Sequence, residues 1–147
     1  MSNKYDVLKL ENQICFPLYA CSKEIVRLYK PFLDEIDLTY TQYITMMVLW
    51  EKREINVKDL GKYLFLDSGT LTPLLKKLEQ KGLITRERSK EDERVVNVTI
   101  TKEGEALKEK AVDIPEKLVS CVKLPQEEAM QLYQILHKLL QSIKEEE

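Results

Sequence analysis

The sequence predicts a mainly α-helical protein with one small β-hairpin, and three observations support this fold class. Apolar residues recur at helical spacing over most of the 147 residues. Capping residues and prolines divide these segments into several separate helices. Strict alternation of apolar and polar residues occurs only at about residues 83–101, in two short segments joined by a charged link. The length fits one compact domain, so residues 1–147 are expected to form a single domain.

The first expected helix covers about residues 10–32, where apolar side chains follow a helical period. Pro17 interrupts this helix because proline has no backbone N–H and crowds the preceding turn, so a kink and a restart both remain open. The next helix is expected in LTYTQYITMMVLW, where Thr39 and Gln42 have the spacing of a capping box.

Two shorter helices are expected after it. One begins near Asn56 in INVKDLGKYLFL. The other lies in LDSGTLTPLLKKLEQKG, with Asp67 or Ser68 as its N-cap and Gly82 as its C-terminal stop. The apolar face of this second short helix is expected to consist of Leu71, Leu74, Leu75 and Leu78.

The segments LITRERS and RVVNVTIT then alternate with a period of two, and the polar link KEDE joins them. They predict a β-hairpin with a charged tip. Thr101 is expected to cap a long helix that Pro115 could kink. Pro125 suits the first position of a last helix.

Helices followed by a hairpin form the winged helix-turn-helix arrangement, expected here over about residues 38–101. Its second short helix would enter a groove of the DNA. Small hydroxyl side chains in its first turn would lie close to phosphates or base edges, and its lysines would contact the phosphate backbone of the DNA. Asp92 is anionic, so its expected role is to orient a neighbouring arginine. The expected DNA-contacting residues are Ser68, Thr70, Thr72, Pro73, Lys76, Lys77, Arg86, Asp92 and Arg94. On the pattern alone, DNA binding and a hairpin with a merely solvated tip are equally open.

Charge and composition narrow the function classes. The net charge is −2, but residues 52–94 contain 11 Lys and Arg against 8 Asp and Glu, a local +3 that permits DNA binding. No run of about 18 apolar residues predicts a membrane span, and the N-terminus lacks the apolar stretch of a signal peptide, so a cytoplasmic location is expected. One histidine and no Cys-x-x-Cys pair argue against a zinc site, and no cofactor is expected.

Cys15 lies between an isoleucine and a phenylalanine in ENQICFPLY. By residue type alone, a small buried hydrophobe is the favoured interpretation and a reactive thiol is the alternative. Cys21 is expected in the core. The three scattered cysteines do not form a disulfide framework.

The stretch LDSGTLTPLLKKLEQKGLITRERSKEDERVVNVTIT resembles the MarR family of bacterial transcription regulators. With QICF, YACSKE, LTYTQY and KEKAVDIP, the resemblance covers nearly the whole chain and extends to the organic-hydroperoxide-sensing, SarZ-like group. It implies a homodimer built from helices in about residues 8–34 and 102–144, in which each winged helix contacts half of an inverted repeat in double-stranded DNA. The last helix carries an apolar stripe that needs burial, and such a dimer would provide it. The stripe consists of Leu132, Ile135, Leu136, Leu139 and Ile143.

The same resemblance implies that Cys15 is the residue oxidised by organic hydroperoxides, after which a regulator that is expected to be a repressor releases its DNA. It implies that tyrosines from different subunits donate hydrogen bonds to the thiolate, at Tyr29 and Tyr40, and Tyr19 is expected to shape the same pocket. Cys121 is a candidate resolving cysteine, because a sulfenic acid condenses readily with a nearby thiol.

Two other functions stay open. One is a regulator of the same family controlled by a small aromatic ligand that binds without reaction. The other is a thiol peroxidase, which is disfavoured because no histidine, arginine or Thr-x-x-Cys arrangement surrounds Cys15. The sequence therefore predicts a regulator and not an enzyme.

Overall fold

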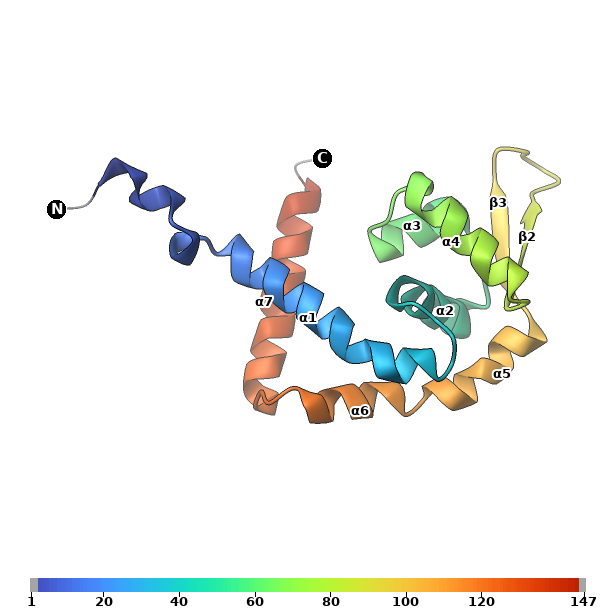
Figure 1. Ribbon diagram of the computed structural model, residues 1–147. Coiled ribbons are helices and arrows are strands. Elements are labelled where there is room, and N and C mark those ends of the chain that lie inside the picture. Colours follow the sequence, from blue (N-terminus) through green and yellow to red (C-terminus); the bar gives the residue numbers. More distant parts are fainter. Residues whose placement is uncertain (1–2, 146–147) are drawn as a thin grey trace. The chain divides into compact units, whose positions relative to one another are not determined.

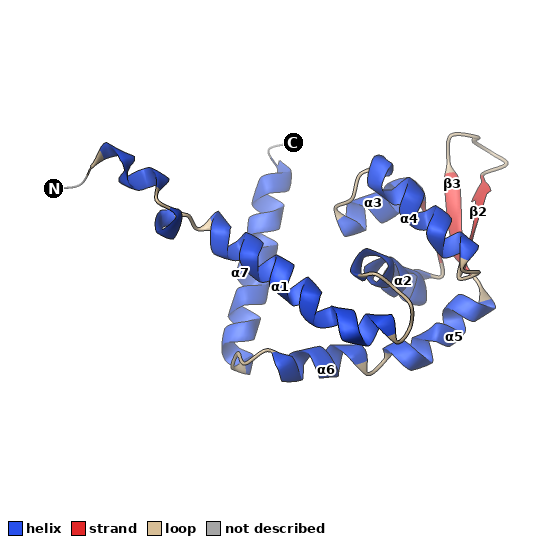
Figure 2. Cartoon of the chain, in the orientation of Figure 1, coloured by secondary structure: helices blue, strands red, loops and turns tan. Residues whose placement is uncertain are grey.

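A computed structural model describes residues 3–145, and its elements are mainly helices with a small sheet (Figures 1 and 2). The chain forms two compact units, Met1–Pro115 and Glu116–Glu147. None of the described helices is long and apolar enough to cross a membrane. In chain order the described elements are η1 (Lys4–Leu8), η2 (Leu10–Asn12), α1 (Cys15–Asp34), α2 (Tyr40–Lys52), β1 (Glu54–Asn56), α3 (Val57–Leu64), α4 (Ser68–Gln80), β2 (Ile84–Arg88), β3 (Val96–Ile100), α5 (Lys102–Ala111), α6 (Ile114–Cys121) and α7 (Gln126–Glu145).

The N-terminal helix begins later than its apolar pattern predicts. Residues 10–12 form the separate 3-10 helix η2, and α1 begins at Cys15, so the expected start near Leu10 is wrong. Pro17 is the third residue of α1, where a backbone N–H would have no acceptor within the helix. The proline therefore belongs to the start of the helix and does not kink it.

The predicted caps of the next helices are confirmed. The Thr39 hydroxyl accepts a hydrogen bond of 3.3 Å from the Gln42 N–H, and the Gln42 side chain accepts one of 3.0 Å from the Thr39 N–H. Asn56 caps α3 and Asp67 caps α4, each through its side-chain oxygen. Gly82 follows α4 with φ of +78°, a left-handed conformation that glycine adopts without a steric penalty.

The hairpin is confirmed, and the structure adds a strand to it. Strands β2 and β3 pair antiparallel, with Ile84 opposite Ile100 and Arg88 opposite Val96. Strand β1 pairs with the other edge of β3, which gives the order β1-β3-β2. Three residues between two helices are too short to display an alternating pattern, so the sequence analysis did not identify β1.

One hydrophobic core joins α1 to α5 and the sheet in the first unit. The predicted apolar face of α4 is buried, as are Leu60 of α3 and Val98 of β3. This packing fixes α4 beside the hairpin and leaves the opposite face of α4 exposed, as in a winged helix-turn-helix. The fully buried side chains include Tyr43, Leu33, Met46, Leu49, Leu60, Leu71, Leu75, Leu78, Ile84 and Val98.

The segment after the sheet forms separate helices and not one kinked helix. Helix α5 ends at Ala111, α6 begins at Ile114, and Pro115 is the second residue of α6, where proline is tolerated. Pro125 immediately precedes α7, one position earlier than predicted, and its carbonyl accepts the Ala129 N–H at 2.9 Å. Large apolar side chains of α7 are exposed within the described chain: Met130, Leu132, Tyr133, Ile135, Leu139, Leu140 and Ile143.

Candidate functional site

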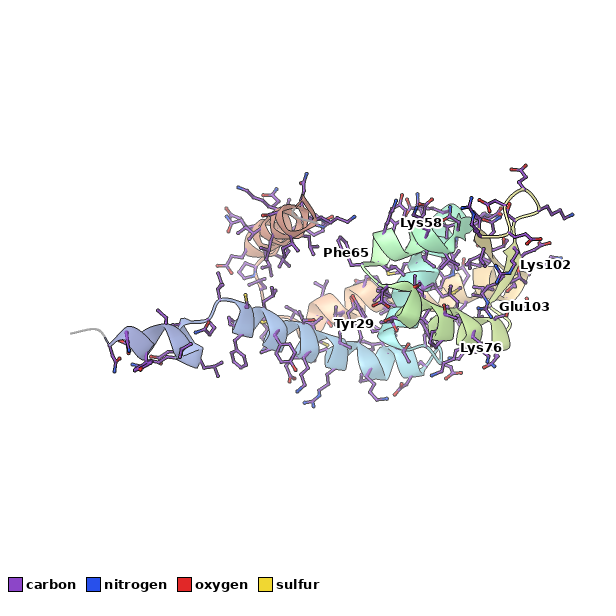
Figure 3. All side chains as sticks on the ribbon, turned by 90° about the horizontal axis from the view of Figure 1, so that it is seen from above. Tyr29, Lys58, Phe65, Lys76, Lys102 and Glu103 are labelled. Atoms are coloured by element: carbon purple, nitrogen blue, oxygen red, sulfur yellow. The ribbon has the colours of Figure 1, made fainter. Side chains whose placement is uncertain are left out.

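The N-terminal half of α4 presents a polar face opposite the core. Asp67 accepts a hydrogen bond of 2.8 Å from the Thr70 N–H, which fixes the first turn. The Thr72 hydroxyl donates to the Ser68 carbonyl at 2.8 Å, so its donor is already used within the helix. Figure 3 shows Lys76 on α4. All the predicted contact residues of this helix are exposed: Ser68, Thr70, Thr72, Pro73, Lys76 and Lys77.

The hairpin tip holds an arginine in a fixed orientation. Asp92 accepts hydrogen bonds from the Arg94 side chain, from Nε at 3.1 Å and from Nη2 at 3.3 Å, and one from the Arg94 backbone N–H at 3.0 Å. These hydrogen bonds lower the pKa of the Asp92 carboxyl. The Arg94 side chain is 91% exposed, so this ion pair supports no core. Asp92 therefore contacts and orients Arg94, while a role of either residue in DNA binding stays a prediction.

Arg86 is less accessible than the other predicted DNA contacts. Its guanidinium donates to Glu79 of α4, from Nη2 at 3.0 Å and from Nε at 3.3 Å. Its side chain is 26% exposed. Arg86 therefore joins β2, the first strand of the hairpin or wing, to α4, the helix predicted to enter DNA and here called the recognition helix. A direct contact between Arg86 and DNA remains a prediction.

Tyr29 and Tyr40 lie together in one protomer, with ring centroids 5.0 Å apart. Tyr43 completes the cluster at 5.7 Å from Tyr29. Burial, with smaller contributions from the two neighbouring tyrosines, raises the pKa of Tyr29 to about 12. Burial also raises the pKa of Tyr40. Both hydroxyls therefore stay protonated at neutral pH and can donate hydrogen bonds.

Cys15 is the first residue of α1, and its side chain is exposed, not buried as its residue type alone suggests. Tyr19 lies one helical turn further and is 64% exposed. Tyr29 lies 14 residues from Cys15 on the same helix, which corresponds to about 21 Å of helical rise. Tyr29 of the same chain therefore cannot reach the Cys15 sulfur.

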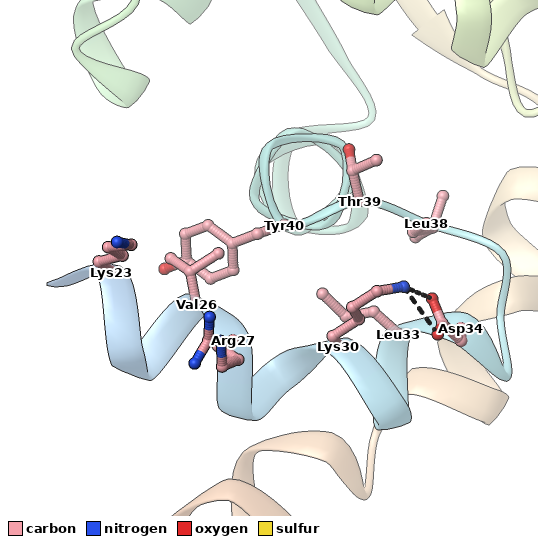
Figure 4. A pocket seen from close by; sticks show the side chains of 9 residues that line it. All are labelled: Lys23, Val26, Arg27, Lys30, Leu33, Asp34, Leu38, Thr39 and Tyr40. Atoms are coloured by element: carbon pink, nitrogen blue, oxygen red, sulfur yellow. Dashed lines mark hydrogen bonds and ion pairs between the residues drawn. The ribbon is translucent and has the colours of Figure 1, made fainter.

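A pocket of about 380 Å³ adjoins the tyrosine cluster, between α1 and the start of α2 (Figure 4). Tyr40 forms part of its wall, and Lys30 at the pocket edge is paired with Asp34 at 3.0 Å. Apolar and cationic side chains both line it: Lys23, Val26, Arg27, Lys30, Leu33, Leu38, Thr39 and Tyr40, with Asp34.

The other two cysteines are also exposed. Cys21 on α1 is exposed in this chain, so the expectation that it lies in the core of the protomer is wrong. Cys121 ends α6, and its thiol donates a weak hydrogen bond of 3.4 Å to the Lys117 carbonyl. Neither has a disulfide partner within the described residues.

The sequence analysis did not identify Tyr43, which completes the tyrosine cluster, or Glu79, which accepts the hydrogen bonds of Arg86. Tyr43 could have been found, because its position three residues after Tyr40 places both on one helical face. Glu79 could not, because its partner Arg86 lies across the turn into β2 and only the fold brings the two together.

Comparison with known proteins identifies the family. A family model described as "Transcriptional regulator SarA/Rot" matches residues 27–111. The "Organic hydroperoxide resistance transcriptional regulator" of Bacillus subtilis (strain 168) is 52% identical over 143 residues, covering 97% of each chain. The "HTH-type transcriptional regulator SarZ" of Staphylococcus saprophyticus is 43% identical over 131 residues, covering 89% of this chain and 90% of that relative.

Solved structures agree with this assignment. Reduced AbfR bound to DNA is 34% identical, with a TM-score of 0.78 and coverage of 95% of this chain and 97% of that chain. The disulfide form of AbfR, a protein of Staphylococcus epidermidis, is 33% identical, with a TM-score of 0.67 and coverage of 95% and 96%. The expected winged helix-turn-helix fold and the resemblance to MarR-type regulators are confirmed. This chain belongs to the SarA/Rot family of transcriptional regulators, among the winged-helix proteins of the MarR type.

Proposed function

We propose that this chain is a homodimeric transcriptional repressor that binds double-stranded DNA and releases it when an organic hydroperoxide oxidises Cys15. The observation that supports DNA binding best is the exposed face of α4, with hydroxyls in its first turn and Lys76 and Lys77 behind them, beside a wing that ends in an exposed arginine. Relatives named as organic hydroperoxide and SarZ regulators support the effector class.

In this proposal, α4 enters the major groove and the wing lies along the neighbouring backbone. Ser68, Thr70 and Thr72 approach phosphates or base edges, with Pro73 beside them, and the lysines neutralise phosphates. Arg94, held by Asp92, extends into a narrow minor groove, where negative potential attracts arginine. Arg86 contributes through its contact with Glu79.

The dimer uses helices outside residues 38–101, in about residues 8–34 and 102–144. Phe16, Leu18 and Ile14 at the start of α1 are exposed in a single chain, as is the apolar face of α7. Exposed apolar surface of this kind on two long helices favours burial against a second copy. A two-fold dimer presents two α4 helices, which fits an inverted-repeat operator.

Oxidation begins with the Cys15 thiolate, which attacks an oxygen of the hydroperoxide ROOH. The S–O bond forms as the O–O bond breaks, and the departing alkoxide takes a proton and leaves as the alcohol ROH. The cysteine is oxidised to a sulfenic acid and the hydroperoxide is reduced. We assign the hydrogen bonds to the thiolate to Tyr29 and Tyr40 of one partner subunit, since these rings are adjacent in one protomer. This replaces the expectation that the two tyrosines come from different subunits.

Cys121 completes the oxidation in this proposal. Its thiol condenses with the Cys15 sulfenic acid of the other subunit, so that an S–S bond forms and water leaves. Both thiols are exposed in the single chain, which supports their reactivity. A covalent dimer in non-reducing electrophoresis is expected after hydroperoxide treatment, and it should be absent in both Cys15→Ser and Cys121→Ser. A monomer that bears a mixed disulfide with an added thiol would contradict this second step.

One experiment tests the function as a whole. A mobility-shift titration uses the region upstream of the protein's own gene, with reduced protein and with protein treated with cumene hydroperoxide. The reduced protein is expected to shift the duplex and the treated protein to leave it free. Catalytic consumption of hydroperoxide in the presence of a thiol reductant would indicate a peroxidase instead of a regulator.

The pocket beside Tyr40 favours a second candidate function, control by a small ligand that binds without reaction. Its volume of about 380 Å³ lies in the range of ligand sites. Release of DNA from Cys15→Ser by a small aromatic anion, such as salicylate, would support this candidate.

A further inference from the structure

Trp50 connects the tyrosine cluster to the helix that follows the wing. The ring of Tyr43 packs against Tyr29 and Tyr40, with its centroid 5.7 Å from that of Tyr29 and 6.4 Å from that of Tyr40. Its edge also contacts Trp50, with centroids 6.4 Å apart and ring planes at 68°. The Trp50 indole donates a hydrogen bond of 2.8 Å from Nε1 to the Gly104 carbonyl in the first turn of α5.

Helix α2 places these aromatic side chains at its two ends. Tyr40 is its first residue, and Trp50 lies two residues before its end at Lys52. Tyr40, Tyr43 and Trp50 are spaced by three and seven residues and therefore share one face of the helix. Tyr43 between them is only 2% exposed. Close-packed interiors transmit displacement, so a shift at Tyr40 reaches Trp50.

Gly104 contacts the base of the wing on its other side. Its N–H donates to the Thr101 hydroxyl at 3.0 Å, and that hydroxyl donates to the Gly82 carbonyl at 2.7 Å. A Cβ atom on Gly104 would lie 2.8 Å from Ile100 Cγ1 and would overlap the Leu83 carbonyl. The backbone of α5 thus packs directly against the ends of β2 and β3, and a movement of Gly104 must displace the base of the wing.

We infer that Trp50 is the positioning residue through which oxidation at Cys15 changes the placement of the wing. This inference rests on the proposed function, in which Tyr29 and Tyr40 contact the reactive thiol of the partner subunit. Oxidation replaces that thiolate and changes its hydrogen bonds with the two hydroxyls. The change passes through Tyr43 and Trp50 to Gly104, along packed rings and one hydrogen bond.

The same helix interface provides a matched control. The Arg53 side chain, which is 74% exposed, forms an ion pair with Glu105 of α5 at 3.8 Å. The Glu105 side chain is 29% exposed and also pairs with Lys108 at 2.7 Å within α5. Ion pairs whose cation is solvent-exposed contribute little to stability, and a glutamine at position 105 keeps the size and hydrogen-bonding capacity of the side chain. Glu105→Gln therefore removes a polar contact between the α2 end and α5 without touching the aromatic chain. It is expected to leave both DNA binding and its response to oxidant unchanged.

The test compares wild type, Trp50→Phe and Glu105→Gln in fluorescence anisotropy with the upstream duplex, before and after cumene hydroperoxide. Trp50→Phe keeps an aromatic ring but removes the Nε1 donor. Wild type is expected to lose affinity on oxidation by about 5- to 150-fold, the usual range of allosteric coupling. In Trp50→Phe this loss should be about fivefold smaller, which corresponds to one hydrogen bond. Reduced Trp50→Phe should bind DNA as wild type does, and its Cys15 should oxidise at the wild-type rate.

Three outcomes are decisive: the first two contradict the inference about Trp50, and the third contradicts the proposed function on which it rests. Equal release of wild type and Trp50→Phe contradicts the role of Trp50 in coupling. An equal loss of DNA affinity by Trp50→Phe in the reduced and oxidised forms indicates a structural role alone and also contradicts it. If wild type itself keeps its DNA after oxidation of Cys15, the proposed function fails instead.

A second measurement does not depend on the folding of Trp50→Phe. Trp50 is the single tryptophan of the chain, so intrinsic fluorescence reports its surroundings directly. Its emission is expected to change when wild type is oxidised without DNA and to stay constant in treated Cys15→Ser. Emission that is identical in reduced and oxidised wild type would contradict a movement at Trp50.

Discussion

Arg86 on the first wing strand and Glu79 in the last turn of α4 are joined by three hydrogen bonds. The guanidinium donates two of them to Glu79 Oε1, at 3.0 and 3.3 Å, and the Arg86 backbone N–H donates the third to Oε2 at 3.0 Å. The C-terminal end of α4 and the first strand of the hairpin are thus joined at the edge of the core, beside the buried Leu78 and Ile84. This contact fixes the angle between the two elements that are proposed to touch DNA.

Glu79→Gln is expected to weaken DNA binding without changing the salt dependence of the affinity, because Glu79 makes no phosphate contact. The hydrogen bonds from Arg86 lower the pKa of Glu79 below its usual value of 4.5. The pair therefore stabilises the fold above that value, and this contribution is lost as pH falls through the lower pKa of the folded state. The Tm difference between wild type and Glu79→Gln should close as the pH falls below 4.5. A difference that persists in acid would show that Glu79 acts through something other than its charge.

Arg94→Ala is expected to weaken DNA binding by about tenfold or more, because its exposed guanidinium is proposed to lie in the minor groove. The slope of log Kd against log salt should fall by about one if a phosphate contact is also lost. Thermal denaturation should show an unchanged fold, since the side chain is 91% exposed. Lys90→Ala, at the same hairpin tip, is the matched control. Equal losses of DNA affinity in the two variants would show that Arg94 acts only through its positive charge and not through a specific contact.

Thr70→Ala is expected to cost about 1 kcal/mol of DNA-binding free energy, the value of one neutral hydrogen bond. Thr72→Ala should cost less, because the Thr72 hydroxyl already donates to the Ser68 carbonyl. Thr70→Ser, which keeps the hydroxyl, should bind as wild type does. Isothermal titration calorimetry with the upstream duplex measures the DNA-binding free energy of all three variants. A Thr70→Ser protein as weak as Thr70→Ala would assign the effect to packing of the methyl group.

Tyr29→Phe is expected to make the protein less sensitive to alkali and slower to respond to hydroperoxide. Unfolded Tyr29 releases its proton near pH 10, while the folded protein keeps it to about pH 12. The folded state therefore loses stability relative to the unfolded state as pH rises from 10 to 12. Thermal melts across this range should show a smaller decrease of Tm in Tyr29→Phe than in wild type. Parallel curves would indicate that the Tyr29 hydroxyl is not held in its neutral form by burial.

The helices and the hairpin were predictable because their signals are local. Thr39 with Gln42, Asn56 and Asp67 each cap a helix through a side chain within three residues of the N–H that they bind. The alternation in LITRERS and RVVNVTIT defined the two longer strands. Each of these signals requires only neighbouring residues, so no knowledge of the fold was needed.

The features that the sequence did not predict depend on residues distant in the chain. Strand β1 exists because Glu54–Asn56 meets the free edge of β3, more than 40 residues later. No local pattern marks Trp50 as a hydrogen-bond donor to α5, because its acceptor is the backbone carbonyl of Gly104, which lies 54 residues later in the chain. The start of α1 was misplaced because apolar periodicity continues through η2, although the backbone does not. Long-range pairing and backbone acceptors require the folded chain.

The proposal that Cys15 is the sensing residue is tested most directly by Cys15→Ser. In fluorescence anisotropy with the upstream duplex, reduced Cys15→Ser is expected to bind as tightly as wild type, because Cys15 lies in α1, outside the proposed DNA-contacting residues. After addition of cumene hydroperoxide, wild type should dissociate while Cys15→Ser remains bound, and dithiothreitol should restore binding of wild type. Dissociation of Cys15→Ser at the same oxidant concentration as wild type would contradict the account.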